Sequence, residues 1–279
     1  MRLNPKYGCD PVVSVEVRGD GVHPLVGQRA RLEGLLRTLS EDEWRHPSRC
    51  AGWTVQDVVS HLTSTNAFWA LSIQAGLLGE PTRYLGDFDP VASPAQLVQQ
   101  ARGTAPTDTL EQFAASCAGL AAVVDALGES DWSTLAEAPP GHLPIGLVAD
   151  HALWDSWVHE RDIVLPLERP PVEEVDEVLT CLRYAAALGG AFDVCGDAAQ
   201  PGAVVLEVTE PDARIVVAVE RDVVAVHDGP APAGSVECRG DAVEILEMLS
   251  MRDAGVPVPG PIRTLTAGLA RVFDEPAPV

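Results

Sequence analysis

The chain has 279 residues, of which 46% are hydrophobic and 22% are charged, so it can form two globular domains and has the composition of a folded protein. Its 41 acidic and 19 basic residues give a net charge of -22, which repels phosphate backbones and anionic lipids and argues against nucleic-acid or membrane partners. The N-terminal region lacks the apolar core of a signal peptide, and no stretch has the roughly 18 consecutive apolar residues of a membrane span. We therefore expect a cytoplasmic protein.

The cysteines are widely scattered and form no CxxC pair, so the sequence indicates neither a disulfide framework nor a thiolate zinc knuckle. We expect most of them to behave as small buried hydrophobic residues. They are Cys9, Cys50, Cys117, Cys181, Cys195 and Cys238.

The N-terminal half of the chain has the pattern of a helical domain. Residues 1–21 show no sustained periodicity and are expected to form a leader. Apolar residues at helical spacing then predict a helix over residues 23–39, and residues 40–43 offer a capping box for a short next turn. A second helix start predicts a long helix over residues 54–78, which contains His61.

Two more helical regions complete this domain. Ser93 and Pro94 are expected as N-cap and first residue of the third region, which is interrupted by a Gly/Pro segment and resumes over residues 109–127. A fourth helix is predicted over residues 147–165. Four helices with mostly modest connections predict a four-helix bundle spanning residues 22–170.

Residues 171–279 are expected to form a smaller α+β domain. A helix over residues 172–190 precedes three short β-rich runs, which are bounded by turn residues and predict an antiparallel meander. Two final helices are expected to pack on this sheet. The three runs cover residues 204–208, 215–219 and 223–226, and the two helices about 241–252 and 261–273.

The residues best suited to carry chemistry lie on two of the predicted bundle helices. His151, Asp155 and His159 are four residues apart and share one helix face, where a carboxylate and an imidazole can bind the same ion. By itself this spacing fits a hydrogen-bonded helix face equally well. His61 lies in an apolar stretch of another helix, where an unpaired imidazole is costly, although a backbone carbonyl often satisfies such a histidine. Metal sites in bundles are commonly built from inward ligands of two helices.

Two segments also resemble a known family. Trp44 with Arg49-Cys-Ala-Gly-Trp-Thr-Val-Gln-Asp-Val-Val-Ser-His61-Leu is similar to the first signature of the mycothiol-dependent maleylpyruvate isomerase family, within the DinB/YfiT-like four-helix metalloproteins. Trp154-Asp-Ser-Trp-Val-His159-Glu-Arg-Asp162 resembles its second signature. The resemblance covers roughly residues 22–170 and, more weakly, the C-terminal α+β domain, which is similar to the family's sterol-carrier-like second domain.

This resemblance implies a set of metal ligands and a thiol cosubstrate. The family takes one histidine from the first signature and a Glu-x-x-x-His pair from the second, which correspond here to His61, Asp155 and His159. Asp155 departs from the family's glutamate, and its side chain is shorter by one methylene. The implied ion is divalent, with zinc expected, and the implied cosubstrate is mycothiol, acting on a small electrophilic substrate.

The sequence allows more than one role for several residues near the predicted ligands. Asp162 either accepts a hydrogen bond from a ligand imidazole or forms a solvated charge or ion pair. His151 is a fourth ligand, a proton shuttle or a structural hydrogen-bonding group. Cys50 is interpreted as structural, because no base lies near it in the sequence.

The tryptophans Trp53, Trp154 and Trp157 are expected to pack around the site. Four arginines of the C-terminal domain are interpreted as surface charges or anion contacts: Arg214, Arg221, Arg239 and Arg263.

Three protein ligands leave an open position on a zinc ion, which is typical of catalytic sites. A thiol entering there would ionise and become a nucleophile at neutral pH. We favour S-transfer over isomerisation at this stage, because a dicarboxylate substrate needs cations and the signatures offer only Arg49 and Arg161. A metal-dependent hydrolase using activated water and a noncatalytic small-ligand-binding metalloprotein are the alternatives. The sequence is compatible with either a monomer or a homodimer as the oligomeric state.

Overall fold

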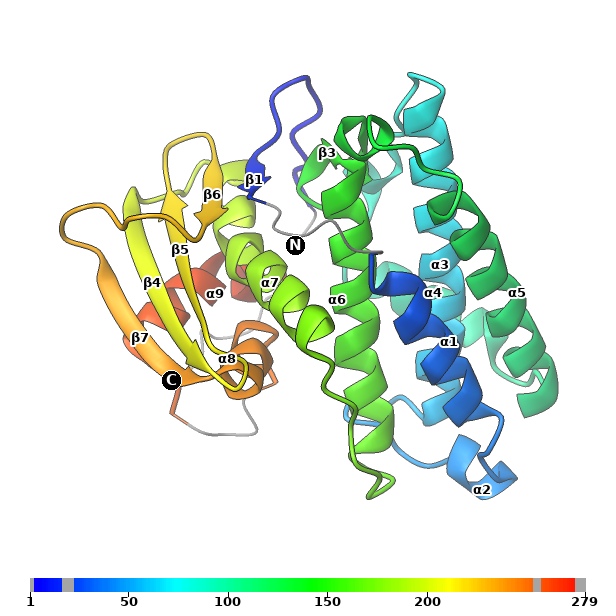
Figure 1. The fold of residues 1–279 in the computed structure, drawn as a ribbon. Helices are drawn as coiled ribbons and strands as arrows, with labels where there is room; N and C mark the ends of the chain where they lie inside the picture. Colours follow the sequence, from blue (N-terminus) through cyan, green and yellow to red (C-terminus); the bar gives the residue numbers. More distant parts are fainter. Residues whose placement is uncertain (1–2, 17–22, 253–256, 274–279) are drawn as a thin grey trace.

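The computed structural model describes residues 3–16, 23–252 and 257–273. A helical part on one side adjoins a part in which helices cover a five-stranded sheet (Figure 1). This confirms the expected combination of helices with a sheet that begins late in the chain.

Four long helices form the helical part: α1 (Leu25–Leu36), α3 (Val55–Leu77), α5 (Pro106–Val124) and α6 (Ile145–Val164). Helices α1 and α3 each contact both α5 and α6. Shorter elements connect them. These are the helices α2 (Glu41–Trp44) and α4 (Ala92–Ala101), the 3-10 turns η1 (Tyr84–Asp87) and η2 (Asp131–Ser133), and a hairpin of β2 (Leu135–Ala138) and β3 (Gly141–Pro144). The hairpin was not predicted.

Local capping signals explain where several helices begin. Thr54 and Asp57 form a reciprocal capping box at the start of α3, and Ser40 and Glu43 form the one predicted for α2. Helix α4 starts earlier than expected, because an Asp89 carboxylate oxygen accepts hydrogen bonds from the first backbone amides, 2.9 and 2.7 Å away. The prediction that Ser93 and Pro94 begin this helix was therefore wrong by two residues.

The sheet has the strand order β1-β6-β5-β4-β7. The strands β4 (Gly202–Thr209), β5 (Ala213–Val219) and β6 (Val224–His227) form the predicted antiparallel meander. Two unpredicted strands flank it in parallel: β7 (Val236–Asp241) on β4 and β1 (Val13–Val15) on β6. The expected leader, residues 1–21, thus contributes a strand to the sheet of the other part of the chain.

Helix α7 (Val175–Cys195) lies between the sheet and α6, and α8 (Ala242–Leu249) and α9 (Gly260–Val272) pack beside it (Figure 1). By length and composition alone α7 could cross a membrane, but most of it is buried inside the protein. Its apolar character is therefore explained by its position in the core. No other helix in the described ranges meets the same criteria.

Two glycines allow α7 and α9 to approach closely. A Cβ atom at Gly189 would overlap the carbonyl oxygen of Leu265, and one at Gly268 would overlap the carbonyl oxygen of Gly189. Both positions face backbone atoms, which cannot move aside as the end of a flexible side chain can. The contact between the two helices therefore requires glycine at both positions.

We predict that Gly189→Ala lowers the free energy of unfolding by about 1–3 kcal/mol, because the added methyl group forces the helices apart. Gly119→Ala on α5 is the matched control, since a Cβ there meets nothing within 4 Å. The control should gain about 0.5–1 kcal/mol from helix propensity. Urea denaturation measures both variants, and equal stability of the two would contradict the role of Gly189.

Candidate metal centre

Helices α3 and α6 bring the predicted ligands together. The two helices pack antiparallel, so a residue further along α3 faces one that is earlier on α6. The rings of His61 and His159 have centroids 4.9 Å apart, and the Thr65 hydroxyl lies 3.3 Å from Asp155 Oδ2. Residues four apart on each helix therefore line one seam. The three predicted ligands all lie on this seam.

The donor atoms in the seam have the spacing of a metal site. Oδ1 of Asp155 lies 3.7 Å from His61 Nε2 and 3.6 Å from His159 Nε2. Both distances are too long for a hydrogen bond. They are close to the separation of about 3.4 Å between neighbouring ligands of a tetrahedral ion with bonds of about 2.1 Å. The three atoms thus fit around one small cation.

Asp162 fixes the orientation of the His159 ring from the opposite side. Its Oδ2 lies 3.0 Å from His159 Nδ1, so Nδ1–H donates to the carboxylate and Nε2 is directed toward Asp155. Asp162 has no exposed surface, which excludes the expected alternative of a solvated charge. A carboxylate behind a ligand imidazole is the usual support for a metal-binding histidine.

The charges around the seam are strongly coupled. Burial lowers the pKa of His159, but the carboxylates of Asp162 and Asp155, together with Cys50, raise it to about 10. Burial raises the pKa of Asp155, yet the surrounding imidazoles hold it well below its usual range. Without an ion, the seam therefore contains an ionised carboxylate and a protonated His159. A metal ion would replace that proton.

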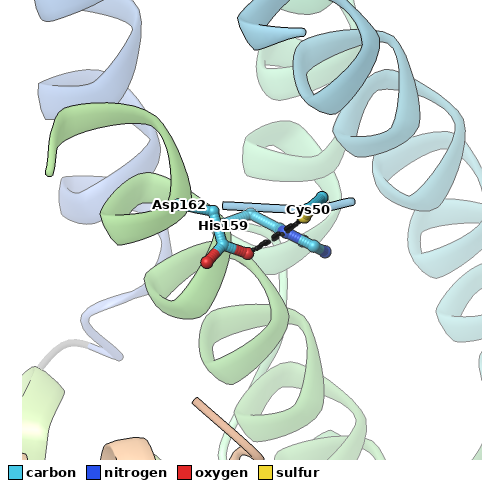
Figure 2. A group of neighbouring side chains, drawn as sticks. All are labelled: Cys50, His159 and Asp162. Carbon is cyan, nitrogen blue, oxygen red and sulfur yellow. Dashed lines mark hydrogen bonds and ion pairs between the residues drawn. The ribbon is translucent and has the colours of Figure 1, made fainter. Parts of the chain in front are cut away.

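A second group of donor atoms shares His159: Cys50, His159 and Asp162, shown in Figure 2. The Cys50 thiol lies 3.1 Å from Asp162 Oδ2 and 3.6 Å from His159 Nδ1. Arg49 and Arg252 both pair with this Asp162 carboxylate. A cation there would lie beside two fixed positive charges, so the first group is the better metal site.

The surroundings of Cys50 correct the sequence-based view of this residue. The sequence places no base near Cys50, but the fold brings the Asp162 carboxylate and the His159 imidazole to its thiol. The three residues lie on different segments, Cys50 being in the loop before α3 and the other two on α6. Its expected structural role remains a prediction.

Arg252 is a site residue that the sequence analysis missed. It follows α8, and its guanidinium donates to both oxygens of Asp162 at 3.1 Å. Glu247, in the last turn of α8, lies 2.8 Å from Arg49 and also pairs with Arg161, so the C-terminal end of α8 is linked to the helical part. Nothing in the local sequence distinguishes Arg252 from other surface arginines. The four arginines named from the sequence make no contact with the ligand group within the described residues.

His151 and the three tryptophans named from the sequence have well-defined contacts in the structure. His151 does not join the ligand group, and its Nδ1 lies 2.6 Å from the Tyr184 hydroxyl, which supports the structural alternative. Trp53 packs on His61 with ring centroids 5.4 Å apart. Trp154 donates to Ser250, and Trp157 is buried beneath the Arg161 guanidinium. Trp53 and Trp154 thus pack against histidines of the seam, as predicted, whereas Trp157 lies on another face of α6.

Comparison with known proteins agrees with this geometry. The sequence profile of the mycothiol maleylpyruvate isomerase N-terminal domain matches residues 25–164, which is half of the chain. The chain belongs to this family. The match begins at α1 and ends at the last residue of α6, so it contains all three seam ligands. No curated protein matches the sequence.

Two solved structures share the fold of nearly the whole chain. The crystal structure of the mycothiol-dependent maleylpyruvate isomerase is 16% identical, with a TM-score of 0.57, and the alignment covers 82% of this chain and 87% of that one. A histidine-to-alanine mutant of that enzyme is 15% identical, with the same TM-score and coverage. The similarity therefore extends beyond the helical part into the sheet-containing part.

The raised pKa of His159 predicts how the stability of the metal-free protein depends on pH. Because the pKa rises from 6.5 to about 10 on folding, the protonated form adds stability that is complete below pH 6.5 and is lost as the pH approaches 10. Between pH 7 and 9 the free energy of unfolding should fall by about 1 kcal/mol per pH unit.

Zinc should abolish this slope, because a ligating imidazole carries no titrating proton. His159→Gln is the control for other titrating groups and should also show little slope in this range. Urea denaturation in the presence of a chelator measures the effect. A metal-free wild-type protein whose stability is constant from pH 7 to 9 would contradict the assigned charge state.

Proposed function

We propose that this protein is a mycothiol-dependent enzyme that acts through a divalent ion, with zinc expected, held by His61, Asp155 and His159. The observation that carries the proposal is the arrangement of three donor atoms at metal-ligand separations on two adjacent helices, with Asp162 orienting one imidazole. The family match and the shared fold support the same conclusion.

The finer architecture is part of the proposal. We infer that residues 22–170 form a DinB-like four-helix bundle and residues 171–279 a sterol-carrier-like domain, preceded by a short N-terminal segment. The pairwise packing of α1, α3, α5 and α6 supports the first assignment, and α7 to α9 on one sheet support the second. We place the protein in the cytoplasm, where low-molecular-weight thiols remain reduced.

The ion would supply a positive charge that ionises an incoming thiol at neutral pH. The residues of the chain have separate tasks. His61, Asp155 and His159 would hold the ion with a position left open, and Asp162 would keep the His159 ring from rotating. The packing of Trp53 against His61 limits the access of water to one side of the seam.

Of the two thiol reactions, we now favour isomerisation of an anionic conjugated substrate over S-transfer. S-transfer was preferred because the signatures contain few cations for a dicarboxylate. Arg252 answers that reason, because it adds a third guanidinium to Arg49 and Arg161. Arg49 and Arg252 share the Asp162 carboxylate, and Arg49 also pairs with Glu247. The Arg252 side chain is 29% exposed and can be reached by a small anion.

The metal assignment predicts about one divalent ion per chain in the purified protein. His61→Ala and His159→Ala should each lose most of it, while Asp155→Glu should retain it and Asp155→Asn should bind more weakly, because it removes a negative charge. Elemental analysis after dialysis measures the content. Thr209→Ala, at the exposed end of β4, is a neutral control. Full occupancy in both histidine variants would refute the assignment.

The thiol assignment predicts that turnover of maleylpyruvate requires both the ion and mycothiol and survives Cys50→Ala. Titration calorimetry should show mycothiol binding to zinc-loaded protein, with release of about one proton as the thiol ionises, and much weaker binding to metal-free protein. Turnover of an ester or amide without any thiol would favour a metal-dependent hydrolase instead. Loss of all activity in a folded Cys50→Ala protein would show that Cys50 is the nucleophile.

A further inference from the structure

The seam between α3 and α6 continues one helical turn beyond Asp155. There Trp69 of α3 faces His151 of α6, with ring centroids 4.8 Å apart. The Tyr184 ring of α7 lies 5.2 Å from His151. We call Trp69, His151 and Tyr184 the aromatic layer. All three residues are at most 7% exposed, and the layer is about 6 Å along the helix from Asp155.

Hydrogen bonding in the aromatic layer fixes the tautomer of His151. The buried Tyr184 hydroxyl has one hydrogen to donate, and its only partner among the described residues is His151 Nδ1, 2.6 Å away. Nδ1 must therefore accept this bond. Burial lowers the pKa of His151 to about 4, against the opposing effect of Asp155, so the ring is neutral at pH 7. Its one proton is therefore on Nε2.

The aromatic layer thus contains two N–H donors and no acceptor for either. Trp69 Nε1 is buried and has no partner among the described residues, and His151 Nε2 makes no hydrogen bond to them but is not fully buried. Buried donors are nearly always satisfied in folded proteins. The neighbouring Trp154 follows this rule, since its Nε1 donates to Ser250 Oγ at 2.9 Å. Trp69 Nε1 thus differs from its neighbour Trp154 and shares the lack of a partner with Trp157 Nε1, which lies away from the seam.

The charges near the layer restrict which chemical group can accept these hydrogen bonds. Burial and then the carboxylates of Asp150 and Asp155 raise the pKa of Tyr184, so two negative groups act on the layer. Neither N–H donor of the layer carries a positive charge that could offset a carboxylate ligand. A carbonyl oxygen carries no net charge and accepts hydrogen bonds through two lone pairs.

We propose that Trp69 and His151 form a subsite that binds an uncharged carbonyl oxygen of a molecule held at the metal centre. This inference rests on the proposed function. The oxygen comes from an amide of the thiol cosubstrate or from the ketone of the second substrate. Tyr184 is a positioning residue, because it acts only by keeping the His151 proton on Nε2.

The test uses the full zinc-loaded protein and a matched pair of variants. Trp69→Phe keeps an aromatic ring and removes the N–H donor. Trp157→Phe makes the same change at another buried indole that lacks a partner, on a different face of α6 from the seam. Zinc content should be unchanged in both. We expect Trp69→Phe to weaken binding about 3- to 10-fold, and Trp157→Phe to leave it at the wild-type value.

Two measurements identify the source of the oxygen. A larger dissociation constant for mycothiol in calorimetry assigns it to the thiol, and a larger KM for maleylpyruvate at saturating mycothiol assigns it to the second substrate. Equal values for Trp69→Phe and Trp157→Phe in both measurements would overturn the subsite. A wild-type protein that does not bind mycothiol at all would instead overturn the proposed function, and the subsite with it.

A spectroscopic measurement makes the test independent of how the variants fold. The indole N–H resonance of Trp69 in ¹⁵N-labelled wild-type protein can be assigned by its absence in the Trp69→Phe spectrum. Addition of mycothiol, or of mycothiol with maleylpyruvate, should move this proton downfield as it gains an acceptor. Tyr184→Phe should reduce the shift. A resonance that stays in place with both compounds would show that the layer holds no part of either ligand.

Discussion

The buried carboxylate of Asp162 is the interaction on which the rest of the structure depends. It accepts from His159 Nδ1, from the Cys50 thiol and from the guanidiniums of Arg49 and Arg252, so three segments of the chain meet at two oxygen atoms. Removal of a carboxylate from water is costly, and only a complete set of donors offsets that cost. Loss of any one partner would therefore disturb the others.

This arrangement joins the two parts of the protein at the candidate metal centre. Arg252 and Glu247 come from the sheet-containing part, while Arg49, Arg161 and Asp162 come from the helical part. The orientation of His159 therefore depends on how the two parts are packed together. A site built in this way can sense the position of α8, because any shift of that helix changes the ion pairs that hold Asp162.

The sequence predicted those features that have a local cause. The capping boxes at Ser40 and Thr54 and the stripe of His151, Asp155 and His159 depend on residues three or four apart, and the structure contains them. Arg252 and Tyr184 could not be found in this way, because their partners lie 90 and 33 positions away in the chain. Tertiary packing alone determines those contacts.

The short strands were missed for a related reason. A strand of three residues, such as β1, has too few positions for an alternating pattern to emerge. The β2–β3 hairpin lies in a segment rich in proline and glycine, which was interpreted as a connection. The bridge between Lys6 and Gly141 beside it joins chain segments far apart in the sequence.

The pairing of β1 with β6 affects the order in which the sheet can form during synthesis. The helical part is inserted between the first strand of the sheet and all the others, so the sheet is completed only after the ribosome has made both ends of the protein. β1 waits for its partner during synthesis and then covers the edge of β6, because an open edge readily pairs with a strand of another molecule. A chain that begins after residue 22 would keep that edge open permanently, although every helix and every candidate metal ligand would still be present.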